Sequence, residues 1–151
     1  MSRRLTGYLC MLFVFASISW AADPFLGTWT ADMAKFRQQV KDLPPGAIGD
    51  TFKVETYKNG YKMTQTVGGK FAYVTTVDFT SGVTPVRDAQ GEEIDRIKVV
   101  RKSATEIETT SQETGVTFNY RILPGGNEIE IKIFNRSDGK PPLTAYYKRV
   151  P

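Results

Sequence analysis

The chain of 151 residues contains no histidine and a single cysteine, Cys10, which lies close to the N-terminus. From residue 23 onward neither residue type occurs. That part of the chain therefore has no disulfide, no cysteine nucleophile, no histidine base or triad, and no zinc site of the usual kinds. Any catalysis there would use Asp, Glu, Lys, Tyr, Ser or Thr side chains, and we expect neither a metal ion nor a cofactor.

A long apolar run is also missing. The apolar stretch at residues 9–18 is shorter than the ~20 residues that a membrane-spanning helix needs. Arginines precede it at 3–4, and the small residues Ser19 and Ala21 follow it at the third-last and last positions before a cleavage site. This layout predicts a signal peptide at residues 1–22, and the alternative interpretation is a membrane anchor.

Cleavage after residue 21 or 22 would place the protein in the periplasm or outside the cell, without stable membrane insertion. The leader carries Cys10, two arginines and no acidic residue, so its removal lowers the formal charge from +4 to +2. The remaining basic side chains are scattered along the chain, and we expect no nucleic-acid partner. Residues 23–151 have the length of one domain.

Most of this domain alternates between apolar and polar residues, which is typical of half-buried strands. Tight turns separate the strands, and the pair Asn59-Gly60 is a strong hairpin signal. Consecutive strands with such short links pair antiparallel, and they close into a barrel or stack as a sandwich. The alternation predicts about nine strands, at residues 25–30, 51–57, 61–67, 71–79, 94–101, 106–110, 116–122, 129–133 and 143–150.

One helix is predicted at residues 34–43, directly after the first strand. Phe36, Val40 and Leu43 recur at helical spacing and form one apolar stripe. Two prolines and a glycine at 44–46 then end the helix.

The start of the domain carries a specific motif. Residues 23–29 read Asp-Pro-Phe-Leu-Gly-Thr-Trp, which resembles the Gly-x-Trp opening strand of the calycin superfamily, comprising lipocalins and fatty-acid-binding proteins. The chain is most similar to bacterial exported lipocalin-like proteins, whose last strand matches Tyr147-Lys148-Arg149 here and whose middle matches Thr84-Pro85-Val86. The resemblance covers the whole domain in layout, but in motif only its two ends and this loop.

The resemblance implies an all-β, antiparallel up-and-down barrel of about 8–10 strands, with one short helix after the first strand and one open end. It implies that Trp29 plugs the closed end, that Arg149 or Lys148 packs across its ring, and that Gly27 allows close backbone approach. Fatty-acid-binding proteins differ, because they have two helices and an arginine carboxylate clamp where this chain has Ala145.

The barrel interior is the expected binding site. Apolar walls with a few polar groups suit a small apolar molecule, and tyrosine hydroxyls would orient it. The alternative is a ligand-free envelope or interaction protein whose core is filled, since eight strands enclose little free space. We expect the binding protein to be a monomer, whereas an interaction protein could associate with itself. The candidate lining residues are Tyr61, Met63, Phe71, Tyr73, Phe79, Phe118, Tyr120 and Ile131.

Carboxylate pairs offer the only enzymatic interpretation, for example a glycosidase-like pair. Glu92 and Glu93 lie in a polar loop close to Asp95, and Glu106 and Glu108 share one strand face opposite Ile107. Both groups fit a solvated surface, so we expect no catalytic residues and no enzyme.

Overall fold

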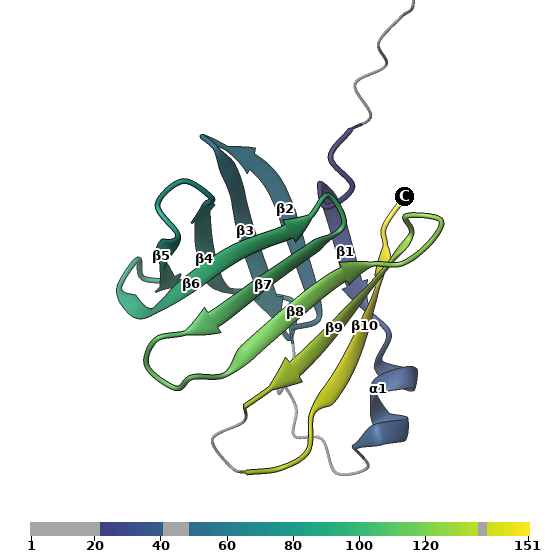
Figure 1. Cartoon of the computed structure of the whole chain (residues 1–151). Coiled ribbons are helices and arrows are strands. Elements are labelled where there is room, and N and C mark those ends of the chain that lie inside the picture. The colour runs from purple at the N-terminus through teal and green to yellow at the C-terminus, as the bar shows by residue number, and fades with distance from the viewer. Residues whose placement is uncertain (1–21, 41–48, 136–138) are drawn as a thin grey trace, which may run out of the picture.

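The computed structural model describes residues 22–40, 49–135 and 139–151, and within them ten antiparallel strands close into one barrel (Figure 1). The predicted signal peptide lies outside the described residues, apart from Ala22. Each strand pairs with its neighbour in sequence, and β1 closes the barrel against β10. The predicted all-β up-and-down barrel is thereby confirmed, and the sandwich is excluded. The strands are β1 (Gly27–Ala31), β2 (Thr51–Tyr57), β3 (Gly60–Val67), β4 (Lys70–Asp78), β5 (Val83–Asp88), β6 (Glu93–Ser103), β7 (Glu106–Ser111), β8 (Thr117–Ile122), β9 (Glu128–Phe134) and β10 (Leu143–Arg149).

The alternation of the sequence places one face of each strand inside the barrel. In β9, Ile129 and Ile131 are buried at 0% and 6% exposure, and the pairing sets them beside Tyr147 and Ala145 of β10. These inward side chains merge into a single core because every strand has a neighbour on both sides. The core therefore lies along the barrel axis.

The strand β5 was not among the nine that the alternation predicts. Its residues, Val83–Asp88, lie in a stretch that we interpreted as a loop because it contains Pro85 and two flanking glycines. In the structure β4 pairs with β5 only at residues 86–88, so Pro85 lies just outside that ladder. Because Pro85 does not take part in the pairing with β4, its lack of an N–H costs no hydrogen bond to that strand. The strand therefore tolerates the proline.

The helix α1 (Met33–Gln39) follows β1 as expected, but it is shorter than predicted. The Asp32 side chain caps its start by accepting a hydrogen bond from the Lys35 N–H at 3.2 Å. Val40, expected on the helical stripe, is already extended, with φ −131° and ψ 100°, whereas residues 41–46 lie outside the described chain. Of the two residues of the predicted stripe that the structure describes, Phe36 is helical and buried, whereas Val40 is not helical.

The helix covers part of an edge of β10 that β1 leaves free, because β1 reaches only residues 147–149. The Gln39 amide both donates to the Thr144 carbonyl (2.6 Å) and accepts from its N–H (3.1 Å). Figure 1 shows α1 beside the lower part of β10. The helix thus takes the place of a longer first strand at this edge.

The hairpin between β2 and β3 has its turn one residue earlier than the Asn59-Gly60 signal suggests. Tyr57 pairs with Gly60, so Lys58 and Asn59 form the turn, and Lys58 has a φ of 47°. A Cβ on Gly60 would lie 2.0 Å from the Val77 carbonyl oxygen. This glycine is therefore needed for space against β4 rather than for an unusual backbone angle.

Candidate functional site

One end of the barrel, here called the closed end, is sealed around Trp29. The indole is fully buried, lies 6.3 Å from the Phe52 ring, and donates its Nε1–H to the Phe25 carbonyl at 3.0 Å. The Arg149 guanidinium lies 4.2 Å from the centre of the indole ring, within range of a cation–π contact. Lys148, the other candidate for this position, instead forms an ion pair with Asp32 at 3.0 Å.

Arg149 also ties the N-terminal segment to the closed end. Its two terminal nitrogens each donate to a carbonyl, of Pro24 and Leu26, at 2.6 Å, and its Nε donates to the Gly126 carbonyl at 3.1 Å. A Cβ on Gly27 would lie 2.8 Å from Nη1 of Arg149, and the Gly27 φ is +128°. Gly27 therefore permits both the backbone conformation and the approach of the guanidinium.

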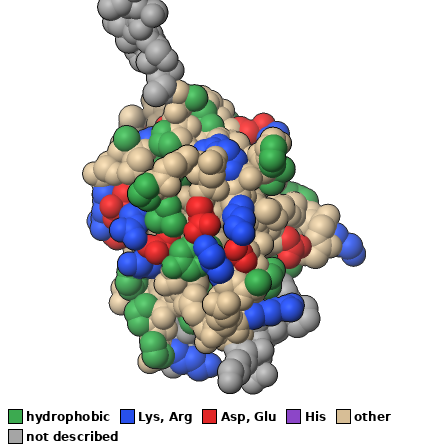
Figure 2. Space-filling model, turned by 90° about the vertical axis from the view of Figure 1, so that its right-hand side faces the viewer, with side chains coloured by type: hydrophobic (Ala, Val, Ile, Leu, Met, Phe, Trp, Pro, Cys, Tyr) green, Lys and Arg blue, Asp and Glu red, His purple; other side chains and the backbone are tan. Residues whose placement is uncertain are grey.

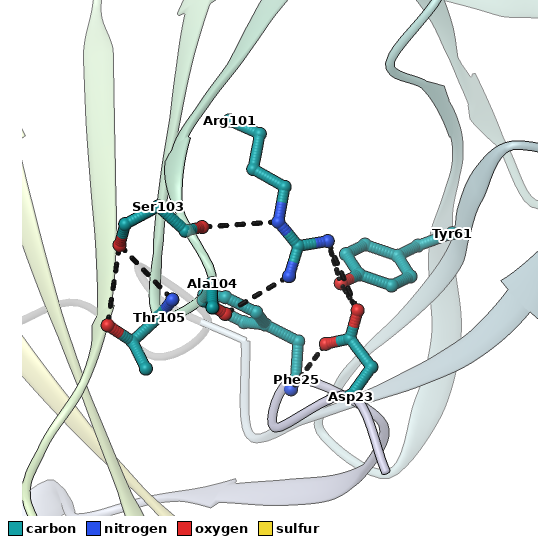
Figure 3. A network of polar contacts seen from close by, with 7 residues as sticks. All are labelled: Asp23, Phe25, Tyr61, Arg101, Ser103, Ala104 and Thr105. Carbon is teal, nitrogen blue, oxygen red and sulfur yellow. Dashed lines mark hydrogen bonds and ion pairs between the residues drawn. The ribbon is translucent and has the colours of Figure 1, made fainter. Parts of the chain in front are cut away.

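A second polar network at the closed end joins Asp23, Tyr61 and Arg101 (Figure 3). The Tyr61 hydroxyl donates to Oδ2 of Asp23, and Arg101 Nη1 donates to that oxygen (3.1 Å) and to the Tyr61 hydroxyl (2.6 Å). The Phe25 N–H donates to Oδ1 of Asp23 at 3.1 Å. The sequence analysis did not predict that Asp23, Tyr61 and Arg101 form a group. These three residues are at least 38 positions apart in the sequence. Only the barrel closure brings them together.

This network changes the ionisation of its members. Burial raises the pKa of Asp23, but hydrogen bonds from Tyr61, the Phe25 N–H and Arg101 outweigh that effect, and the pKa is lowered overall. Burial and the Asp23 hydrogen bond both raise the pKa of Tyr61 above its ordinary value. The carboxylate is therefore charged and the phenol neutral at any physiological pH.

The lowered pKa of Asp23 predicts an acid-dependent stability. A carboxyl whose folded pKa lies below its unfolded value stabilises the fold above the unfolded pKa, near 3.8, and this contribution is lost as pH falls through the folded pKa. As the pH is lowered below about 4, we expect the free energy of unfolding to decrease, and to decrease less steeply in Asp23→Asn. Urea denaturation at a series of pH values measures both slopes. Equal slopes in the two proteins would contradict the assignment.

The closed end is nearly filled by side chains. The interior next to it contains a cavity of about 10 Å³, which is room for about one water molecule. Three of the predicted lining residues, Tyr61, Met63 and Tyr120, border this cavity. The cavity is far smaller than a typical ligand pocket of about 300–1,000 Å³. It is lined by Phe25, Phe52, Val54, Tyr61, Met63, Val77, Ile107, Thr109 and Tyr120.

The opposite half of the interior is less completely buried. Along β4, the inward residues change from Val77, 1% exposed, to Tyr73, 40% exposed. Along β9 and β8 the inward residues likewise change from buried Ile129 and Ile122 to partly buried Ile133 and Phe118. Several side chains that face the axis in this half therefore contact solvent, although Thr84 and Ser111, which flank Ile97, are buried. We call it the open half, and its partly buried or exposed inward residues are Gln65, Tyr73, Ile97, Phe118, Ile133 and Leu143.

The remaining predicted lining residues lie in different places. Phe118 and Tyr120 both lie on β8, and their rings are stacked with centres 6.4 Å apart. Ile131 of β9 is buried. Phe79 lies in the turn after β4, where its ring meets that of Tyr61 edge to face at 5.3 Å. These contacts place Phe79 at the closed end.

Phe71 does not share a face with Tyr73, although the alternation predicts that it does. The pairing of β3 with β4 shifts between Gln65 and Thr66, so that Tyr73 lies opposite Gln65 and Phe71 opposite Thr66. Thr66 faces outward, since its hydroxyl bonds that of Thr51 on the outer face of β2. The bulge therefore puts Phe71 on the outer surface, where it is 43% exposed.

The interior also contains hydroxyl groups that sequence reasoning missed. Thr84, Thr109 and Ser111 are all buried, on β5 and β7. Among the described residues Thr84 Oγ1 has no hydrogen-bond partner. Burial raises the pKa of Tyr120 to about 12, while a hydrogen bond with Thr109 works in the opposite direction. These groups are among the polar contacts that the barrel interior offers.

The carboxylate groups considered for catalysis have structural partners. Glu93 pairs with Arg96 at 2.6 Å and with Arg87 at 3.8 Å, beside a surface depression of about 380 Å³. Glu108 pairs with Lys102 at 2.6 Å, and Glu106 accepts a hydrogen bond from Asn119 at 2.8 Å. In the described parts of the chain, no three Asp or Glu side chains lie together as metal ligands would.

The outer face around α1 and β10 carries charges of both signs. Glu130 pairs with Arg121 at 2.7 Å and with Lys132 at 3.7 Å, and Lys35 pairs with Glu128 at 2.9 Å. Figure 2, viewed from this side, shows basic and acidic side chains mixed across the middle of the face. The Lys35–Glu128 pair is solvent-exposed and contributes little to stability, and charges of both signs alternate, so the face forms no field of a single sign.

The fold defines the class of protein as a closed antiparallel β-barrel with one short helix after its first strand, an architecture compatible with a lipocalin-like fold. A scan against protein-family models and a search of curated proteins found no match for this chain. In the described ranges no helix has both the length and the apolar character needed to cross a membrane.

Proposed function

We propose that this chain is an exported, lipocalin-like binding protein that holds a small apolar molecule in the open half of the barrel. The observation that carries the proposal is the decrease in burial along the barrel axis, from Val77 to Tyr73 on one strand and from Ile129 to Ile133 on another. Export is supported by the leader-like residues 1–22, and the lipocalin-like character by the motif that ends at Trp29.

The two halves of the barrel have different roles in this proposal. The filled closed end forms a rigid floor, because its cavity of about 10 Å³ admits nothing larger than a water molecule. A ligand would lie above this floor and bury the exposed faces of Tyr73 and Phe118. Burial of apolar area of this kind is the main driving force for binding a neutral molecule. The partly buried inward side chain of Gln65, opposite Tyr73, is available to orient it.

Titration with an environment-sensitive apolar dye tests the proposal. We expect saturable binding to the wild-type protein, and about 30-fold or more weaker binding to a Tyr73→Ala/Phe118→Ala variant, because burying each of the two rings contributes about 1–2 kcal/mol. Tyr57→Ala is the matched control, since Tyr57 lies at the other end of the barrel next to a turn, and it should leave the affinity unchanged. Absence of saturable binding, or equal loss in the control, would reject the site.

A second candidate, a ligand-free envelope or interaction protein, is favoured by the nearly filled core at the closed end. It predicts that the dye does not bind with saturation and that the mature protein associates with itself or a partner. Size-exclusion chromatography of the purified protein, expected to elute as a monomer under the binding proposal, separates the two.

A further inference from the structure

At the closed end, the Arg101 guanidinium is held in place by groups other than its acidic partner. Its Nε donates to the Ser103 carbonyl at 3.1 Å and its Nη2 to the Ala104 carbonyl at 3.0 Å (Figure 3). Both acceptors are main-chain groups at the β6–β7 turn. The remaining nitrogen, Nη1, is thereby aimed across the barrel end toward β3.

A carboxylate occupies the position at which Nη1 is aimed. Asp23 Oδ2 accepts from Arg101 at 3.1 Å and also from the Tyr61 hydroxyl, and these two donors come from β6 and β3. Charge-assisted bonds to a carboxylate from an arginine and a second donor are among the stronger polar contacts in proteins. The Asp23 and Arg101 side chains are each 28% exposed, so a carboxylate in solution can approach the guanidinium, whereas Tyr61 is 4% exposed.

An aromatic ring follows the carboxylate into the apolar interior. Phe25, two residues after Asp23, is 3% exposed and borders the interior cavity. Its ring lies 6.1 Å from that of Tyr61, and the Arg101 guanidinium lies 5.8 Å from it and 5.3 Å from the Phe79 ring. The Asp23 carboxylate thus lies between the Arg101 guanidinium and the Tyr61 hydroxyl, and the nearby Phe25 ring fills an apolar pocket beneath them.

We propose that Arg101, Tyr61 and the pocket around Phe25 form a binding site for a small arylalkanoate, and that the chain's own Asp23–Phe25 segment occupies this site as a tethered ligand. A free arylalkanoate binds in exchange: its carboxylate replaces that of Asp23, and its ring replaces that of Phe25. The segment is the competitor, so occupancy by free ligand depends on releasing it. The site is at the opposite end of the barrel from the open half and does not depend on the function proposed above.

The backbone contacts of the segment explain why exchange is limited in the wild-type protein. Trp29 and Arg149 bind the carbonyls of Pro24, Phe25 and Leu26, but neither contacts the Asp23 carboxylate. The ion pair can therefore open alone, whereas removal of the Phe25 ring also strains these bonds. A variant that lacks both competing groups isolates the site while retaining the Trp29 seal.

The probe is 4-phenylbutanoate, and 4-phenylbutan-1-ol is its neutral counterpart. We expect Asp23→Asn/Phe25→Ala, expressed from the full chain, to bind the acid at least about tenfold more tightly than wild type, because charge-assisted hydrogen bonds are no longer satisfied internally. It should also bind the acid about tenfold more tightly than the alcohol. Adding Arg101→Gln should remove the preference for the acid. Calorimetric titration measures each affinity, and the near-ultraviolet dichroism of the same samples reports whether the barrel is folded.

The wild-type protein provides a measurement that does not depend on folding of the variant. The Phe25 N–H donates to Asp23 Oδ1. Its hydrogen should exchange with solvent faster in saturating 4-phenylbutanoate than in buffer alone, and 4-phenylbutan-1-ol should not change its exchange rate. The proposal is overturned if a folded double variant shows no preference for the acid, if the preference survives Arg101→Gln, or if the Phe25 amide exchanges equally with and without the acid. Dye binding in the open half is measured with other variants, so the two proposals can fail separately.

Discussion

Replacing Trp29 with alanine should lower the free energy of unfolding by about 3–5 kcal/mol, the range measured for buried aromatic side chains. The side chain is completely buried, and its removal leaves a cavity at the seal of the closed end. The same substitution removes the N–H that donates to the Phe25 carbonyl. It also removes the aromatic ring that the Arg149 guanidinium contacts at 4.2 Å. Because folded domains are stable by only about 5–15 kcal/mol, the variant should be close to its unfolding threshold.

Urea denaturation followed by circular dichroism measures this loss. Trp29→Phe is the matched control, since it keeps an apolar ring beside Phe52 but lacks the N–H that bonds the Phe25 carbonyl. It should cost about 1–2 kcal/mol, the usual effect of leaving one buried polar group unsatisfied with some loss of volume. A loss below about 1 kcal/mol in Trp29→Ala would show that Trp29 does not hold the closed end together.

The barrel should lose stability steeply above pH 10. Burial raises the pKa of Tyr120 to about 12 and raises the pKa values of Tyr61 and Tyr147 as well, from an ordinary value of 10.0. A raised folded pKa means that the stabilising contribution is complete below the unfolded pKa and is lost as pH rises toward the folded one. For Tyr120 alone, a rise of the pKa from 10.0 to about 12 corresponds to a contribution on the order of 3 kcal/mol, and the three tyrosines act in the same direction.

Tyrosinate absorbance and dichroism recorded together during alkaline titration test this prediction. Part of the tyrosinate signal should rise together with unfolding rather than before it. Tyr120→Phe should reduce the loss of stability between about pH 10 and pH 12, because the phenylalanine ring cannot ionise in the unfolded chain. Ionisation of all the tyrosines while the barrel remains folded would contradict the burial of these three phenols.

Much of the barrel was predictable because strand formation leaves a local signature. The inward faces of β8 and β9 follow directly from the alternation of Phe118, Tyr120 and Ile122 and of Ile129 and Ile131. The signature fails where two neighbouring strands go out of register. The bulge that turns Phe71 outward is a property of the β3–β4 pair, and the alternation of β4 alone contains no trace of it.

The candidate sites were only partly predictable, since they depend on depth along the barrel axis. Tyr61 and Tyr73 both occupy inward positions of an alternating strand. Tyr61 is 4% exposed at the closed end, whereas Tyr73 is 40% exposed in the open half. Alternation specifies which face of a strand a residue occupies, but not how far the interior is filled at that level. Arg101 was not selected because a single arginine in an alternating strand has no distinctive spacing.

The sequence by itself determined the all-β class, the antiparallel order of the strands, the helix after β1 and the aromatic residue that seals one end, because each depends on local periodicity, short turns or a compact motif. Only the tertiary structure decided that the sheet closes on itself, that the burial of inward side chains decreases along the barrel axis, and that Asp23, Tyr61 and Arg101 meet. These features arise from contacts between residues far apart in the chain. Their geometry depends on strand register and closure, which no single segment encodes.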